Sequence, residues 1–245
     1  MSKKVKVISL ERSIDRKNYF IENNPHLDYE FINGIDGQLL TEDEINNPLH
    51  FINPLPFSSL GAYGVALSHL SLWNRAIEEK MPITVAEDDA IFRYDFHLRS
   101  EEIILQLPID WDIILWGWNF DSILSLLLMI NFSPAVVLFN QDMLRNNIDK
   151  FKLEKTNSFP LRLDKCFGIP AYTISAKGAE LFKHLLFPLK NFELFFPFLN
   201  KNIPNTGIDV AMNKIYSTTG SFVSFPPLVI TKNEHKFSTI QIANK

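Results

Sequence analysis

Short runs of apolar residues, each long enough for one buried strand, recur along the chain. They fall at residues 5–10, 29–32, 83–86, 111–116, 167–175 and 226–231. Between some of these runs, apolar residues return every three or four positions, the period of a helix with one buried face, most clearly over residues 61–79. Strands that alternate with helices predict an α/β protein in which helices cover both faces of a sheet.

Polar residues mark where several helices begin or end. Residues 13–23 predict a helix that ends before an Asn-Pro pair. Thr41 followed three positions later by Glu44 is a capping-box pattern, in which two side chains bind the free backbone N–H groups of a helix start. Ser175 is expected to begin a helix over residues 177–186.

The longest apolar tract, residues 122–139, raises the question of a membrane span. Asn131, Ser133 and Pro134 interrupt it, and a span needs about 20 predominantly apolar residues. The tract therefore predicts a buried helix, a turn and a strand.

Composition is that of a soluble globular protein, with 46% hydrophobic and 21% charged residues in a chain of 245. The net charge is −4 and no basic block stands out, which argues against nucleic acid as a partner. Cys166 is the single cysteine, so an internal disulfide and a thiolate metal cluster are excluded. The first apolar run is too short for a signal peptide, and we expect a cytoplasmic protein.

Three adjacent acids, Glu87, Asp88 and Asp89, follow the apolar run at residues 83–86. Ligands in open α/β sheets bind at the carboxyl ends of strands. If the strand continues, Glu87 and Asp89 share one side and Asp88 faces the other. Two carboxylates suit Mg²⁺ or Mn²⁺ bridged to phosphates. A solvated strand end is the alternative, and the residues alone leave both open.

The sequence around these acids resembles the signature of glycosyltransferase family 25, the bacterial lipooligosaccharide sugar transferases. The residues that carry the resemblance are Gly61, Gly64, Ser68-His69, Trp73 and Glu87-Asp88-Asp89. Further similar segments follow the family's order: "VISLERSIDRKNYF", "FINGIDG", "GIPAYTISAKGAELF" and "TGIDVAMNK". Ala62 and Val65 depart from the Glu and Cys that many relatives have. The resemblance decides the acid triplet in favour of a metal site.

The resemblance implies a GT-A-type, Rossmann-like mixed sheet flanked by helices, with a smaller C-terminal acceptor lobe. The chain would be one domain, with residues 1–120 as the nucleotide-sugar-binding half and 121–245 as the acceptor half. The implied reaction is the inverting transfer of a hexose, galactose first, from a UDP-sugar to a lipooligosaccharide or LPS glycan. A glucosyltransferase and a non-catalytic UDP-sugar- or glycan-binding relative are the alternatives.

Metal and catalytic roles follow from the same resemblance. Glu87 and Asp89 would hold Mn²⁺ or Mg²⁺, and His235 would complete the shell unless it is an exposed tail residue. Asp209 is the first candidate for the base that takes the acceptor's proton; it equally suits the start of a helix over residues 210–216. Asp121 is the second candidate, with a simple turn residue as its alternative.

Nucleotide-sugar binding is assigned to five residues. Arg12 and Arg16 follow the first strand and suit phosphate and uracil oxygens, although either also suits a plain surface position. Asp36 would accept a ribose hydroxyl or form an Asx-turn beside a glycine. His69 would face the diphosphate or lie on the helix surface beside Trp73, which is expected in the core. Asp88 is also assigned to the nucleotide sugar.

The Phe-rich segment at residues 188–205 has two interpretations. It forms the core of the acceptor lobe, or it presents an apolar surface to the inner membrane, where a lipid-linked oligosaccharide would be presented.

Overall fold

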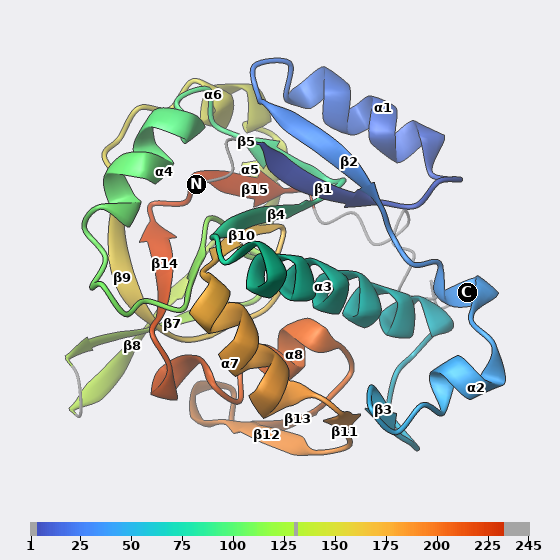
Figure 1. Cartoon of the computed structure of the whole chain (residues 1–245). Coiled ribbons are helices and arrows are strands. Elements are labelled where there is room, and N and C mark those ends of the chain that lie inside the picture. The colour runs from blue at the N-terminus through green and yellow to red at the C-terminus, as the bar shows by residue number, and fades with distance from the viewer. Residues whose placement is uncertain (1–3, 130–131, 233–245) are drawn as a thin grey trace.

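Strands and helices alternate in the structure, a computed structural model that describes residues 4–129 and 132–232 (Figure 1). The strands of the main sheet are β1 (Val5–Ser9), β2 (Tyr29–Asn33), β4 (Ile83–Glu87), β6 (Ile113–Leu115), β7 (Ile123–Met129), β8 (Ser133–Leu138), β9 (Phe159–Cys166), β10 (Ala171–Ile174) and β14 (Ser221–Phe225). Their order is β2-β1-β4-β10-β6-β14-β9-β7-β8. Small two-stranded pairs join β3 (Phe51–Ile52) to β11 (Leu189–Lys190), β12 (Glu193–Phe196) to β13 (Lys201–Pro204), and β5 (Ala90–Phe92) to β15 (Val229–Thr231).

Helices lie against this sheet and in the connections around it. They are α1 (Ile14–Asn23), α2 (Glu42–Ile45), α3 (Leu60–Glu79), α4 (Phe96–Ile104), α5 (Gln141–Arg145), α6 (Ile148–Lys152), α7 (Ala176–Leu186) and α8 (Ile208–Met212). Short 3₁₀ turns are η1 (Gly37–Leu39), η2 (Pro197–Leu199) and η3 (Tyr216–Thr218). The expected mixed sheet flanked by helices is therefore confirmed.

The central strands are buried on both faces, as their near-continuous apolar sequences require. Val85 of β4 joins a core with α3, α7 and α8, whereas Ala86 joins a second core with α1 and α4. Leu115 and Ile114 of β6 divide between the same two cores. This alternation makes three layers, with the sheet in the middle.

Local signals that predicted helix starts are borne out. Thr41 and Glu44 form a complete capping box at α2. The Ser175 side chain accepts a hydrogen bond from the Gly178 N–H at the start of α7. Each cap satisfies backbone N–H groups that have no partner within their own helix.

The prediction for residues 122–139 is wrong in its first half. The tract forms the antiparallel β7–β8 hairpin, with no helix among its described residues. Its β7 half buries Leu124 and Leu126, whereas Leu128 and Leu138 are exposed near the sheet edge. Continuous apolar sequence does not separate a buried helix from a strand pair, because neither period shows in it.

Parallel pairing of β1 with both β2 and β4 determines where a site is built. The carboxyl ends of these three strands meet at one edge of the sheet. β10 then runs antiparallel between β4 and β6, so residues from both halves of the chain form one sheet. None of the helices in the described part of the chain has the length and hydrophobicity that a bilayer crossing needs.

Candidate functional site

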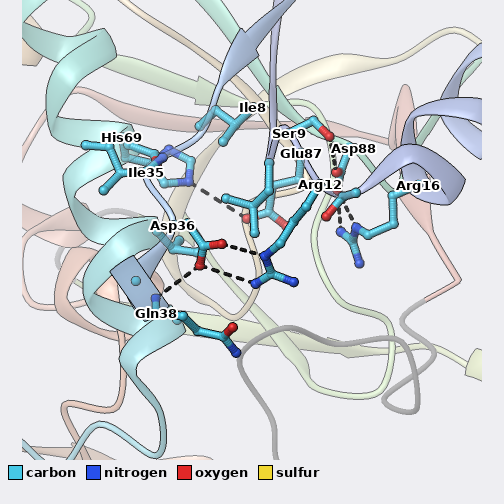
Figure 2. A pocket seen from close by; sticks show the side chains of 16 residues that line it. Ile8, Ser9, Arg12, Arg16, Ile35, Asp36, Gln38, His69, Glu87 and Asp88 are labelled. Carbon is cyan, nitrogen blue, oxygen red and sulfur yellow. Dashed lines mark hydrogen bonds and ion pairs between the residues drawn. The ribbon is translucent and has the colours of Figure 1, made fainter. Parts of the chain in front are cut away.

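A pocket opens at the shared carboxyl edge of β1, β2 and β4 (Figure 2). The empty space inside it, including the open solvent at its mouth, is about 690 Å³. Predicted site residues that line this strand-end pocket are Arg12, Arg16, Asp36, His69, Glu87 and Asp88. Segments far apart in sequence thus converge where the sequence predicted.

One wall of the pocket is an ion pair between the loops that follow β1 and β2. The Arg12 guanidinium donates to Asp36 through Nε (2.5 Å) and Nη2 (3.2 Å). Asp36 also accepts from the Gln38 N–H at 3.0 Å, which is the Asx-turn expected of it. The hydrogen bond from Arg12 is the main cause that lowers the pKa of Asp36. Asp36 is therefore an anion held at the pocket mouth.

A second ion pair joins α1 to the acid triplet. Arg16 approaches Asp88 through Nε (2.6 Å) and Nη2 (2.5 Å), and its Nη2 lies 3.7 Å from Asp89. Ser9 donates to the other Asp88 oxygen at 2.6 Å. Burial acts to lower the pKa of Arg16, but the carboxyls of Asp89, Asp88 and Glu87 outweigh it and the pKa is raised. Asp88 thus fixes a guanidinium beside the acids.

The other two acids, Glu87 and Asp89, both have raised pKa values, and burial is the largest cause for each. β4 ends at Glu87, and Asp88 and Asp89 form the turn to β5, so the side alternation assumed for a continuing strand does not apply to them. Burial, and then the charges of Asp209 and Asp88, raise the pKa of Glu87 to about 8 against the lowering effect of Arg16. Burial and the charge of Glu87 raise the pKa of Asp89 to about 6.

These carboxyls fit a divalent cation that is shared with phosphate. One Asp89 oxygen, Oδ1, is buried and has no hydrogen-bond partner in the described structure. Over residues 4–129 and 132–232, no cluster of three or more His, Cys, Asp or Glu side chains could by itself hold a metal ion. Magnesium-type sites, however, commonly use one or two carboxylates and complete the shell with substrate phosphates and water. His235, the predicted third ligand, lies outside the described residues.

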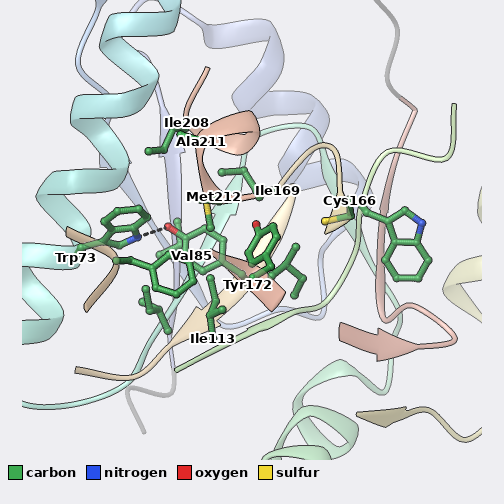
Figure 3. Packing of buried hydrophobic residues seen from close by; sticks show 14 of the residues in the cluster. Trp73, Val85, Ile113, Cys166, Ile169, Tyr172, Ile208, Ala211 and Met212 are labelled. Atoms are coloured by element: carbon green, nitrogen blue, oxygen red, sulfur yellow. Dashed lines mark hydrogen bonds between the residues drawn. The ribbon is translucent and has the colours of Figure 1, made fainter. Parts of the chain in front are cut away.

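His69 reaches the pocket from α3 (Figure 2), and the other side of its ring contacts Tyr172 of β10. Its Nδ1 lies 2.8 Å from the Tyr172 hydroxyl, and that hydroxyl accepts a hydrogen bond from Trp73 Nε1 at 2.9 Å (Figure 3). Its Nε2 faces Glu87 Oε1 at 3.8 Å. Burial lowers the pKa of His69 to about 4. The side chain is 1% exposed, so it is not a helix-surface histidine, and Trp73 is core as expected.

Ser68 and two glycines seat α3 against the loop that carries Asp36. Ser68 Oγ accepts from the Ile35 N–H at 2.8 Å and donates to the Gly64 carbonyl at 2.7 Å. A Cβ on Gly64 would lie 2.3 Å from the Ile35 carbonyl oxygen, and one on Gly37 would lie 1.8 Å from the Leu60 oxygen. The Gly-rich helix start therefore permits a close approach of backbone to backbone.

The two predicted catalytic acids are in different places. Asp209 lies in the first turn of α8, behind the N-cap Gly207, and accepts from the Gly168 N–H at 3.1 Å. Its charge adds to the raised pKa of Glu87, but it is not among the residues that line the strand-end pocket. Asp121 is exposed ahead of β7 and is not among the residues that line the strand-end pocket.

Sequence reasoning missed Ser9 and Tyr172 and gave Ser68 no role. Ser9 is the last residue of β1, so its position at a strand end was the available signal. Tyr172 lies about a hundred residues from its partners on α3, and no local pattern connects them.

Comparison with known proteins agrees with the early resemblance. The family model of glycosyltransferase family 25 (LPS biosynthesis protein) matches residues 2–194, which include the whole strand-end pocket but not Asp209. No curated protein matches the chain. A solved structure titled "Crystal Structure of A197 from STIV" covers 100% of both chains at 11% identity with a TM-score of 0.39. A score this low does not establish a shared fold.

Proposed function

Because the chain belongs to glycosyltransferase family 25, the LPS-biosynthesis glycosyltransferases, we propose that it transfers a hexose, galactose first, from a UDP-sugar to a lipooligosaccharide glycan. Transfer would invert the anomeric carbon, in a GT-A-type arrangement with the acceptor on the residues 121–245 half. The observation that carries this proposal is the crowding of Glu87 and Asp89 beside a pocket that also holds Arg12 and Arg16.

Glu87 and Asp89 are the residues that would hold Mn²⁺ or Mg²⁺. When bound, the ion supplies positive charge that stabilises a leaving diphosphate. Arg16 is already a fixed cation at the same place, and its fork suits phosphate oxygens. The Arg12–Asp36 pair at the mouth would bind the base and ribose, with Asp36 accepting a ribose hydroxyl.

Asp209 is the residue we propose as base. An acceptor hydroxyl must lose its proton as its oxygen attacks, and a carboxylate within reach takes that proton. Asp209 accepts a hydrogen bond from the Gly168 N–H, and its charge contributes to the raised pKa of Glu87. Both observations support its role as the base. The exposed Asp121 is the second candidate.

The β12–β13 hairpin and η2 supply a surface for a lipid-linked acceptor. Phe195 and Phe198 are 53% and 51% exposed there, whereas Phe196 is buried against Phe167. We expect Phe195→Ser with Phe198→Ser to reduce co-sedimentation with inner-membrane lipid vesicles. Unchanged co-sedimentation would remove membrane contact from the proposal and leave the transfer reaction in place.

Thermal shift tests the donor site directly. UDP with Mn²⁺ should raise the Tm, and GDP or CMP should not, because a ligand that binds only the folded state stabilises it. Glu87→Ala and Asp89→Ala should abolish the Mn²⁺-dependent part of the shift, with Asp142→Ala, at an exposed position that does not line the pocket, as the control. Equal shifts in all four proteins would refute the assignment.

Asp209→Asn separates transfer from binding. This variant should retain the shift with UDP and Mn²⁺ but lose hexose transfer to acceptor glycans, measured with a panel of UDP-sugars. A wild-type protein that binds UDP and Mn²⁺ but transfers no sugar from any donor would instead indicate the non-catalytic relative.

A further inference from the structure

The His69 ring lies between two different environments. On one side, Nδ1 is 2.8 Å from the Tyr172 hydroxyl. That hydroxyl accepts from Trp73 Nε1 at 2.9 Å (Figure 3). On the other, Nε2 is directed into the strand-end pocket, 3.8 Å from Glu87 Oε1 (Figure 2). That nitrogen is buried and makes no hydrogen bond within the described residues. Buried polar atoms usually have a partner, so this one needs an explanation.

The hydrogen-bond chain determines which nitrogen carries the proton. Trp73 Nε1 only donates, so the Tyr172 oxygen accepts from it. The single Tyr172 proton is then donated to His69 Nδ1, the other polar atom within reach. His69 Nδ1 is therefore an acceptor, and the ring proton is on Nε2. A buried N–H donor thus faces Glu87.

We propose that His69 is a positioning residue for Glu87, which it orients by donating from Nε2 to the carboxylate that holds the cation. The 3.8 Å separation needs to close by less than 1 Å to become a hydrogen bond. Tyr172 and Trp73 fix the donor in that direction. This inference rests on the proposed function, because it assigns Glu87 to the divalent cation.

Two substitutions distinguish this role from a merely structural one. The amide nitrogen of Gln extends to about the place of the His Nε2, whereas the shorter Asn amide reaches only the place of Nδ1. His69→Gln therefore retains a donor toward Glu87, and His69→Asn retains only a partner for Tyr172. Loss of a hydrogen bond that supports a metal ligand typically weakens metal affinity by about 10-fold to 100-fold.

Mn²⁺ is titrated calorimetrically into each protein in saturating UDP, and the Tm is measured without metal. His69→Asn should raise the Mn²⁺ Kd at least about 10-fold, and His69→Gln should restore most of that affinity. Unchanged Kd values, or a stronger loss in His69→Gln than in His69→Asn, would overturn the role of His69. A wild-type protein that binds no Mn²⁺ with UDP would overturn the proposed function as well.

The tautomer gives a test without substitution. Long-range ¹H–¹⁵N spectra of the wild-type histidine rings should show the His69 proton on Nε2. A proton on Nδ1 would overturn the inference even if the variants fail to fold.

Discussion

Replacing Tyr172 by Phe should destabilise the protein although it removes one oxygen atom from a fully buried ring. The Tyr172 hydroxyl is shared by Trp73 and His69, at 2.9 Å and 2.8 Å. Both partners are at most 1% exposed, so neither can turn to water. Leaving a buried donor or acceptor unpaired costs about 1–3 kcal/mol per group. Leaving two such groups unpaired should lower the free energy of unfolding by at least about 2 kcal/mol. For a domain of this size, that loss corresponds to a decrease of roughly 4–8 °C in Tm.

Tyr216 provides a matched control. Its ring is also fully buried, but its hydroxyl has no hydrogen-bond partner among the described residues. Tyr216→Phe should therefore leave stability unchanged or raise it. Urea unfolding of the two variants, with the same slope in each, measures the difference. Equal stabilities for Tyr172→Phe and Tyr216→Phe would refute the account of the buried hydroxyls.

Three further outcomes are expected. Gly64→Ala should lower the free energy of unfolding by about 1–3 kcal/mol in urea titration, because its methyl would meet the Ile35 carbonyl oxygen; a gain would contradict the close approach, since Ala is otherwise the better helix former. With a chelator present, stability should fall as pH rises from about 4.5 to about 8, because folded Glu87 retains a proton that the unfolded chain releases. Glu87→Gln should flatten that slope in Tm measurements, and an unchanged slope would exclude Glu87 as its source. Cys166 is buried and its thiol pKa is raised well above the usual range, so a thiol reagent such as DTNB should react only after unfolding; fast reaction of the native protein would contradict its burial.

The early strands and helices could be predicted because each has a local cause. The apolar strand before Glu87 and the helical period over α3 each show in a few consecutive residues. β9 was missed although Leu161 and Leu163 alternate with Arg162 and Asp164, a period of two that signals a half-buried strand. The β7–β8 hairpin gave no such signal, because its apolar residues are consecutive.

Site residues could be predicted where they end strands or follow them. Asp36 and Glu87 are at such places, and parallel pairing brings them together. What each carboxyl contacts could not be predicted, because the partners come from other elements. Arg16 binds Asp88 across seventy-two positions, and Tyr172 meets His69 across more than a hundred. Tertiary packing alone decides those pairs.

The adjacent residues Ser68 and His69 contact two different segments of the pocket from one helix turn. Ser68 fixes the loop of Asp36, and His69 faces the acid at the end of β4. An engineer who transplants the Asp36 loop from another transferase therefore has to bring the first half of α3 with it. Donor preference in such chimeras should follow the loop and helix as a single exchangeable module.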